Sequence, residues 1–131
     1  MKDVNDLIGK QFQSGGRGPN VYDCYGLVRE VYHRHGIDLP DYSIAADACQ
    51  QIEGQIEEEK TSGKWIQIDE PEIPCLVLLR CHVDFVQHLG VYVGAGKFLH
   101  IREEKEKGVV VNRLDDPLWK KRFRGFWEYV Q

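Results

Sequence analysis

The chain has 131 residues, of which 42% are hydrophobic and 29% charged, a balance typical of a globular protein large enough to bury one core. Its formal net charge of −4, from 17 basic and 21 acidic residues, argues against a nucleic-acid-binding protein, which usually carries a basic surface. No segment approaches the roughly 20 consecutive apolar residues of a membrane-spanning helix. Because no internal repeat or linker divides the sequence, residues 1–131 are expected to form a single domain.

The N-terminal segment Met1–Asp6 lacks the apolar stretch of a signal peptide. The sequence therefore predicts a protein made in the cytoplasm without a signal peptide, a processed fragment, or a protein that leaves the cell by a route needing no such signal. The spacing of the four cysteines matches no dense disulfide scaffold, and we expect all of them to be thiols. They are Cys24, Cys49, Cys75 and Cys81.

Helical spacing of apolar residues dominates the first part of the chain. Residues 3–12 are predicted to form a short helix with Val4, Leu7 and Ile8 facing inward. The following stretch, Gly15–Asn20, is too rich in Gly and Pro to be helical. A second helix is predicted from about Cys24 to His35, ended by a glycine cap. Its inward face and its cap are Leu27, Val28, Val31, Tyr32 and Gly36.

A third helix is predicted to start near Ile44, after Ser43 as its N-cap, and to end near Glu59. From Trp65 onward the period changes to that of strands separated by turns, with one short helical turn opened by Asp115–Pro117. The predicted strands are Trp65–Ile68, Cys75–Leu79, His88–Val93, Lys97–Ile101, Gly108–Val111 and Arg124–Val130. Helices followed by an antiparallel meander of about five or six strands predict an α+β fold.

Cys24 is predicted to lie in the first turn of its helix. Unpaired backbone N–H groups and the positive end of the helix dipole are located there, and both favour the nucleophilic thiolate. The alternative is an ordinary small cysteine buried in the core. A cysteine nucleophile also needs a base within hydrogen-bond reach, and that base needs a partner that orients it.

Among the five histidines, His88 and His100 are the two placed to act together. They lie on two strands joined by a short turn, at positions that come close to opposite each other in an antiparallel hairpin, so the two imidazole rings can meet. A helix N-terminus that packs on this sheet and carries Cys24 completes a Cys-His-His set. The alternative for the two histidines is an ordinary pair of half-buried strand residues.

Metal binding is a second hypothesis for the same three side chains. One cysteine and two histidines are a possible zinc ligand set with an open position, although no two of them have a short ligand spacing. A second candidate zinc set is Cys75, Cys81 and His82. The two cysteines of that set are spread along one strand, and core packing explains them better.

Three blocks of sequence, Tyr22–Val28, Gln87–Gly94 and Gly96–His100, resemble the NlpC-type cell-wall cysteine peptidases. These are papain-like domains that cut peptides of bacterial peptidoglycan. The resemblance covers nearly the whole chain and implies a papain-like fold. The segments Gly16–Pro19 and Leu114–Trp119 are most similar to the branch found in phage tails, where the domain serves as a tail-associated wall hydrolase.

The resemblance implies a role for each residue of the Cys-His-His set. Cys24 would be the nucleophile, His88 the general base, and His100 the third polar residue, which orients His88. The backbone N–H of Cys24 would donate to the developing oxyanion. No metal and no cofactor is expected.

Substrate contacts are implied for the residues next to the nucleophile. The hydroxyl of Tyr22 is expected near the oxyanion or the substrate, and Asp23 is expected to help receive the free amine of the substrate. Tyr25 stands where the family most often has serine, so we expect it to narrow or redirect the substrate pocket.

The predicted function is a cysteine endopeptidase that cuts the γ-D-glutamyl to diamino-acid bond of peptidoglycan, or a neighbouring peptide bond. The expected partners are the peptidoglycan stem peptide and other phage tail proteins, without nucleic acid and without a membrane span. The expected place of action is the bacterial cell wall. Two alternatives remain open: a structural tail component without catalysis, and an acyltransferase or amidase that uses the same three residues.

Overall fold

The computed structural model describes residues 3–13, 15–40, 65–80, 86–102 and 108–130. The predicted helix from Ile44 to Glu59, and with it Cys49, lies outside these residues, as do Cys81 and His82. No helix among the described residues is long and apolar enough to span a membrane. The elements are η1 (Asn5–Leu7), β1 (Gln11–Phe12), β2 (Val21–Tyr22), α1 (Cys24–Arg34), β3 (Trp65–Ile68), β4 (Leu76–Arg80), β5 (Val86–Gly94), β6 (Lys97–Arg102), β7 (Gly108–Arg113), α3 (Pro117–Arg122) and β8 (Phe123–Tyr129).

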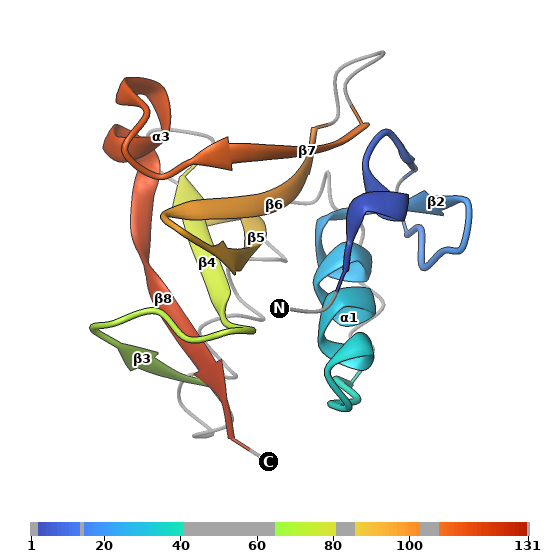
Figure 1. The fold of residues 1–131 in the computed structure, drawn as a ribbon, viewed down its shortest axis with the longest axis horizontal. Helices are drawn as coiled ribbons and strands as arrows, with labels where there is room; N and C mark the ends of the chain where they lie inside the picture. The colour runs from blue at the N-terminus through green and yellow to red at the C-terminus, as the bar shows by residue number, and fades with distance from the viewer. Residues whose placement is uncertain (1–2, 14, 41–64, 81–85, 103–107, 131) are drawn as a thin grey trace.

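The main sheet has six strands in the order β3-β8-β4-β5-β6-β7, and all of its neighbours are antiparallel. This confirms the predicted α+β fold and the predicted number of strands. The expected simple meander is wrong, because β8 returns to lie between β3 and β4 (Figure 1). In this position Trp127 of β8 pairs with Leu76 on one side and with Gln67 on the other. The last strand therefore has hydrogen-bonding neighbours on both sides and is no edge strand.

The predicted helix over residues 3–12 is also wrong. Only η1 forms a single 3₁₀ turn, and Gly9 then takes a φ of +89°. The N–H of Gly9 donates to the carbonyl of Val109, and the N–H of Val109 donates to the carbonyl of Lys10. Pairing with β7 thus overrides the local helical spacing. Leu7 is buried as predicted.

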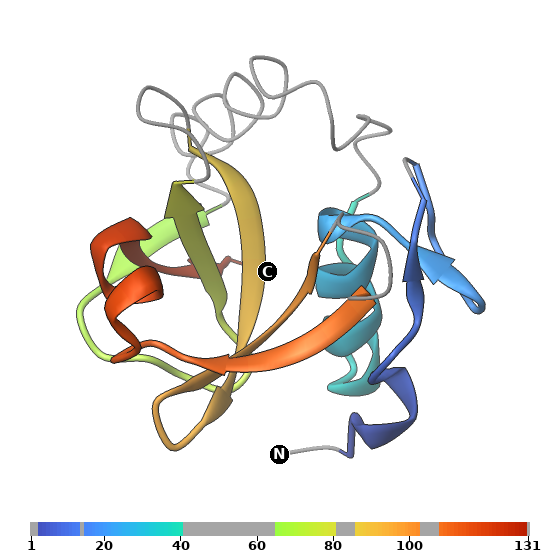
Figure 2. The same cartoon turned by 90° about the horizontal axis from the view of Figure 1, so that it is seen from above.

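The predicted helix from Cys24 to His35 is confirmed as α1, which begins at Cys24. Gly36 follows its end with a φ of +80°, the left-handed conformation of a glycine cap. The helix packs against β5 and β6 (Figure 2). Its buried apolar face is the predicted set of Leu27, Val28, Val31 and Tyr32.

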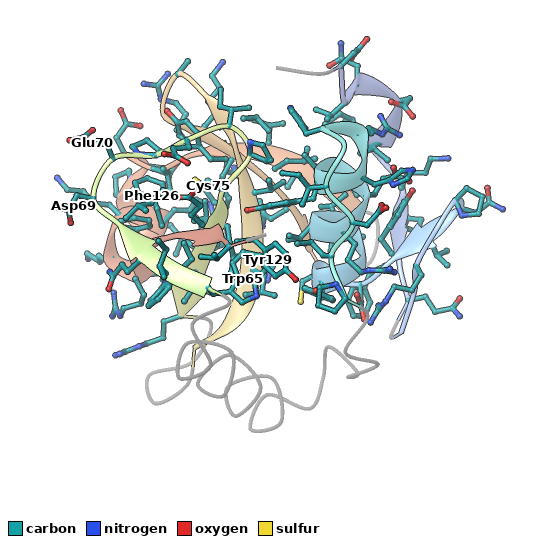
Figure 3. All side chains as sticks on the ribbon, turned by 90° about the horizontal axis from the view of Figure 1, so that it is seen from below. Trp65, Asp69, Glu70, Cys75, Phe126 and Tyr129 are labelled. Atoms are coloured by element: carbon teal, nitrogen blue, oxygen red, sulfur yellow. The ribbon has the colours of Figure 1, made fainter. Side chains whose placement is uncertain are left out.

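Buried side chains form two clusters, one on each face of the sheet. The first cluster joins α1 to strand residues that include Leu89, Val91, Leu99 and Ile101. At the far end of α1, Tyr32 packs edge-on against Trp65, which also contacts Tyr129 (Figure 3). The second cluster lies under α3 and consists of Val77, Leu79, Phe98 and Trp119.

Cys75 is fully buried at the start of β4, and burial raises the pKa of its thiol to about 11 from 9.0. The folded state therefore keeps this proton at a pH where the unfolded chain has lost it. The resulting stability is fully present below pH 9 and is lost as the pH rises through 11. We expect the free energy of unfolding to fall by roughly 2–3 kcal/mol over this interval because of Cys75 alone.

Urea unfolding at a series of pH values, followed by circular dichroism, measures this fall. The Cys75→Ala variant is the control, because its other titrating groups are those of the wild type. Its curve should descend less steeply between pH 9 and 11. Parallel curves for the two proteins would contradict the assignment.

Candidate active site

The first turn of α1 is held by the side chain of Asp23, which is buried with only 1% of its surface exposed. One carboxylate oxygen accepts from the backbone N–H of Gly26 at 2.7 Å and from the guanidinium of Arg17 at 2.7 Å. The other accepts from the N–H of Gly15 at 3.2 Å. Asp23 is therefore the N-cap of the helix and also anchors the glycine-rich loop to it. This contact network fixes the position of Cys24, the next residue.

The glycine at position 26 is required by the close approach of the same loop. A Cβ atom added to Gly26 would collide with the carbonyl oxygen of Gly16. That carbonyl also accepts from the N–H of Asp23 at 3.1 Å. The Asp-Cys-x-Gly pattern thus has a local physical reason, since the aspartate caps the helix and the glycine lets the loop pass.

Cys24 is the first residue of α1 and is 4% exposed. Its side chain belongs to the cluster between α1 and the sheet. It lies at the positive end of the helix dipole, where a negative charge is stabilised. Its predicted role as nucleophile stays a prediction at this point.

His88 on β5 and His100 on β6 meet as the hairpin spacing predicts. His88 Nε2 lies 2.7 Å from His100 Nδ1, and the two rings are arranged edge to face. The turn between the strands consists of Ala95 and Gly96, both with positive φ, and Gly94 pairs with Lys97. The sequence predicted a three-residue turn, Gly94–Gly96, which is one residue too long.

Asn112 on β7 is a further member of this group that sequence reasoning missed. Its Oδ1 lies 2.6 Å from His100 Nε2. Asn112 pairs with Phe98 across β6 and β7, so it shares a sheet face with His100. The predicted strand ended at Val111, one residue too early to include Asn112, whereas β7 continues to Arg113. In a strand of that length, the alternation of side chains between the two faces would have placed Asn112 on the face of Val110.

Aromatic rings enclose His100, which has no exposed surface. Phe98 stacks on its ring at a centroid distance of 4.5 Å, and Trp119 of α3 approaches edge-on at 4.7 Å. Trp119 also lies roughly parallel to the ring of His88 at 6.1 Å. Hydrogen bonds in such a low-dielectric environment are stronger than in water, and leaving one unmade there is costly.

The histidines and α1 are on different faces of the sheet, since Leu89 and Val91 point toward the helix while His88 points toward Trp119. Among the described residues, the paired positions of β5 and β6 end at Val91 and Leu99. Beyond that pair the two strands diverge (Figure 2). The level of His88 thus lies beyond the paired part of the two strands.

The tyrosines beside Cys24 have partners within the protein. Tyr22 is 1% exposed, and its pKa is raised by burial and by the negative charge of Glu30. The hydroxyl of Tyr25 donates to the carbonyl of Pro40 at 2.5 Å, and Arg17 lies over its ring. The substrate contacts predicted for Tyr22, Asp23 and Tyr25 stay predictions.

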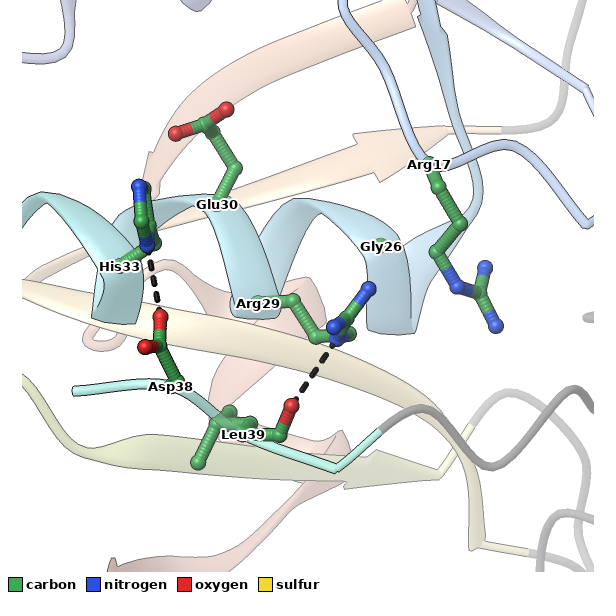
Figure 4. A pocket seen from close by; sticks show the side chains of 7 residues that line it. All are labelled: Arg17, Gly26, Arg29, Glu30, His33, Asp38 and Leu39. Atoms are coloured by element: carbon green, nitrogen blue, oxygen red, sulfur yellow. Dashed lines mark hydrogen bonds and ion pairs between the residues drawn. The ribbon is translucent and has the colours of Figure 1, made fainter.

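A pocket runs along the outer side of α1 (Figure 4). Arg29 donates to the carbonyl of Leu39 at 3.2 Å, and His33 contacts Asp38 at 2.7 Å. Both positive and negative side chains line it, and none of Cys24, His88 and His100 does. The lining residues are Arg17, Gly26, Arg29, Glu30, His33, Asp38 and Leu39.

Within the described part of the chain, no three His, Cys, Asp or Glu side chains gather as metal ligands would.

Comparison with known proteins gives a consistent picture. The sequence pattern of the NlpC/P60 family matches residues 9–128. The tail tip assembly protein K of Escherichia phage lambda is 30% identical over 129 residues, which are 96% of this chain and 60% of that protein. The probable endopeptidase p60 of Listeria innocua is 28% identical over 120 residues, 91% of this chain and 22% of that protein. This chain thus spans less than two thirds of either relative.

Among solved structures, an NlpC/P60 family protein from Bacillus cereus superposes with a TM-score of 0.67 at 20% identity, over 95% of this chain and 37% of that one. This similarity concerns the fold. It agrees with the papain-like α+β architecture expected from the sequence.

Replacing Asp23 by Ala removes the cap of α1 and leaves Arg17 without its buried partner. We expect the free energy of unfolding to fall by roughly 2–3 kcal/mol. Asp116→Ala is a matched control, because Asp116 caps α3 through Leu118 but is exposed. The control should cost only about 0.5–1 kcal/mol. Urea unfolding compares the variants, and equal losses would refute the anchoring role of Asp23.

Proposed function

The chain belongs to the NlpC/P60 family, and we propose that it is a cysteine peptidase that hydrolyses peptides of peptidoglycan. The observation that supports this most is the hydrogen bond between His88 and His100 on the two strands against which α1 packs. α1 begins at Cys24, so the proposed nucleophile lies at one end of the helix that packs on these two strands.

The direction of α1 supports the approach of Cys24 to His88. Tyr32, near the end of the helix, packs on Trp65 at the end of the sheet where β4 begins, whereas His88 pairs with Leu79 toward the end of β4. The helix runs opposite to β4 (Figure 1). From Tyr32 back to Cys24 it covers about 12 Å, at 1.5 Å per residue. Its first turn thus lies toward the His88 level, where β5 and β6 diverge.

The chemical steps follow from these groups. His88 takes the proton of the Cys24 thiol, and the thiolate attacks the carbonyl carbon of the substrate. The backbone N–H of Cys24 donates to the oxyanion that forms. His88 returns the proton to the leaving amine as the thioester forms, and water then attacks the thioester with His88 as base.

We further propose the γ-D-glutamyl to diamino-acid bond of the stem peptide, or a neighbouring peptide bond, as the bond that is cut. The relative from phage lambda is named as a tail tip assembly protein. By analogy, this chain acts at the bacterial cell wall as part of a phage or prophage tail, with other tail proteins as partners. Residues 1–131 act as one catalytic domain without a metal or cofactor.

The neighbours of Cys24 have two kinds of proposed role. Tyr22 and Tyr25 flank the nucleophile and shape the substrate pocket. The carboxylate of Asp23 already accepts from Gly15, Arg17 and Gly26, so it would receive a substrate amine only by sharing these oxygens. Positioning of the first turn of α1 is therefore its main proposed role.

Cys24→Ala tests the nucleophile. It should lower the rate of muropeptide cleavage by about 10³-fold or more, because no other group can form the thioester. Mass spectrometry of products from purified sacculi identifies the bond that is cut. Circular dichroism should remain that of the wild type, because the side chain is small.

Alkylation by iodoacetamide separates catalysis from a purely structural role. Cys24 should react well before Cys75 near neutral pH, because Cys75 has no exposed surface and a raised pKa. Equal, slow labelling of both and no cleavage of sacculi would favour a structural tail component. Transfer of the acyl group to an amine instead of water would favour an acyltransferase.

Replacing each histidine by alanine tests which of the two is the general base and which orients it. His88→Ala removes the base and should lower the rate of cleavage by about 10³-fold or more, whereas His100→Ala should lower it less. Single-turnover cleavage of muropeptides at saturating substrate measures both. A larger loss from His100→Ala than from His88→Ala would reverse the assigned roles.

A further inference from the structure

Asn112 ends a row of three hydrogen-bonded side chains that crosses three neighbouring strands. His88 lies on β5, His100 on β6 and Asn112 on β7, with contacts of 2.7 Å and 2.6 Å between them. His100 faces His88 through Nδ1 and Asn112 through Nε2, and His88 faces His100 through Nε2. A neutral imidazole has one nitrogen that donates and one that accepts, so the state of one ring dictates the state of the next.

We propose that Asn112 is a positioning residue that sets the tautomers of both histidines. The effect of Asn112 on the rate of cleavage rests on the proposed function, whereas its effect on the tautomers does not. Its Oδ1 can only accept, so His100 carries its hydrogen on Nε2. His100 Nδ1 then has a lone pair and accepts from His88 Nε2–H. His88 Nδ1 is left with a lone pair, and this is the nitrogen that takes the proton from the Cys24 thiol.

The burial of His100 restricts the tautomers that its ring can adopt. His100 has no exposed surface and is packed between Phe98 and Trp119, so water cannot replace a missing partner. Without the acceptor on Asn112, a hydrogen on His100 Nε2 would lose its 2.6 Å hydrogen bond at a fully buried position. The reverse tautomer avoids this cost, because Nδ1–H then donates to His88 Nε2. In that state the hydrogen of His88 is on Nδ1, and His88 no longer accepts from Cys24 there.

Two variants of position 112 separate the acceptor from the shape of the side chain. Asn112→Leu keeps the approximate volume and removes the acceptor, whereas Asn112→Asp keeps an oxygen that can only accept. Val111→Ala is the matched control on the same strand, because Val111 points to the other face and is 40% exposed. Thermal unfolding of each variant reports any general damage to β7.

The first readout is the position of the ring hydrogens and needs no substrate. Two-bond ¹H–¹⁵N correlation spectra of the full chain with ¹⁵N-histidine, at pH 8 where an ordinary imidazole is neutral, distinguish protonated from unprotonated ring nitrogens. We expect hydrogen on Nε2 of both His88 and His100 in the wild type, in Val111→Ala and in Asn112→Asp. In Asn112→Leu both histidines should shift toward the Nδ1–H form.

The second readout is the rate of muropeptide cleavage at the same pH. Asn112→Leu should lower it about 10- to 100-fold, and Asn112→Asp should restore it to within about threefold of the wild type. A wild-type His100 with its hydrogen on Nδ1, or an Asn112→Leu protein with unchanged tautomers, overturns the proposal. The expected tautomers in a protein that cleaves no muropeptide would instead uphold the role of Asn112 and refute the proposed function.

Discussion

The buried carboxylate of Asp23 is the contact on which the rest of the site depends. It caps α1 through Gly26 and is paired with Arg17, so a negative charge is held at the positive end of the helix with a compensating cation beside it. A buried charge without these donors would be costly, and the loop would lose the side-chain contacts that tie Gly15 and Arg17 to the helix. The direction of the first turn, and with it the place of Cys24, follows from this one side chain.

The sheet holds the two histidines, because successive side chains of a strand point to opposite faces of the sheet. One face of β5 and β6 carries aliphatic residues that hold α1, and the opposite face carries His88 and His100 beside Trp119 of α3. A single pair of strands therefore both fixes the helix and holds the polar row.

Local chemistry explains which parts of this arrangement the sequence predicted. The helix from Cys24 and the facing histidines depend on residues close to one another in the chain, and both were expected. Asp23 was expected at the substrate, and its role as the cap of α1 was not predicted. The place of β8 depends on pairing with β3 and β4, and the loss of the first helix depends on contacts with Val109; neither is visible from spacing. Asn112 was missed because the predicted strand ended at Val111, whereas β7 continues to Arg113 and brings Asn112 to His100.

The backbone bonds between Val109 and the segment Gly9–Lys10 have a consequence for association between molecules. They occupy amide groups on the outer rim of β7, which would otherwise be a template on which a strand of another molecule could add. The N-terminal residues thus block the addition of a strand from another molecule at this edge of the sheet.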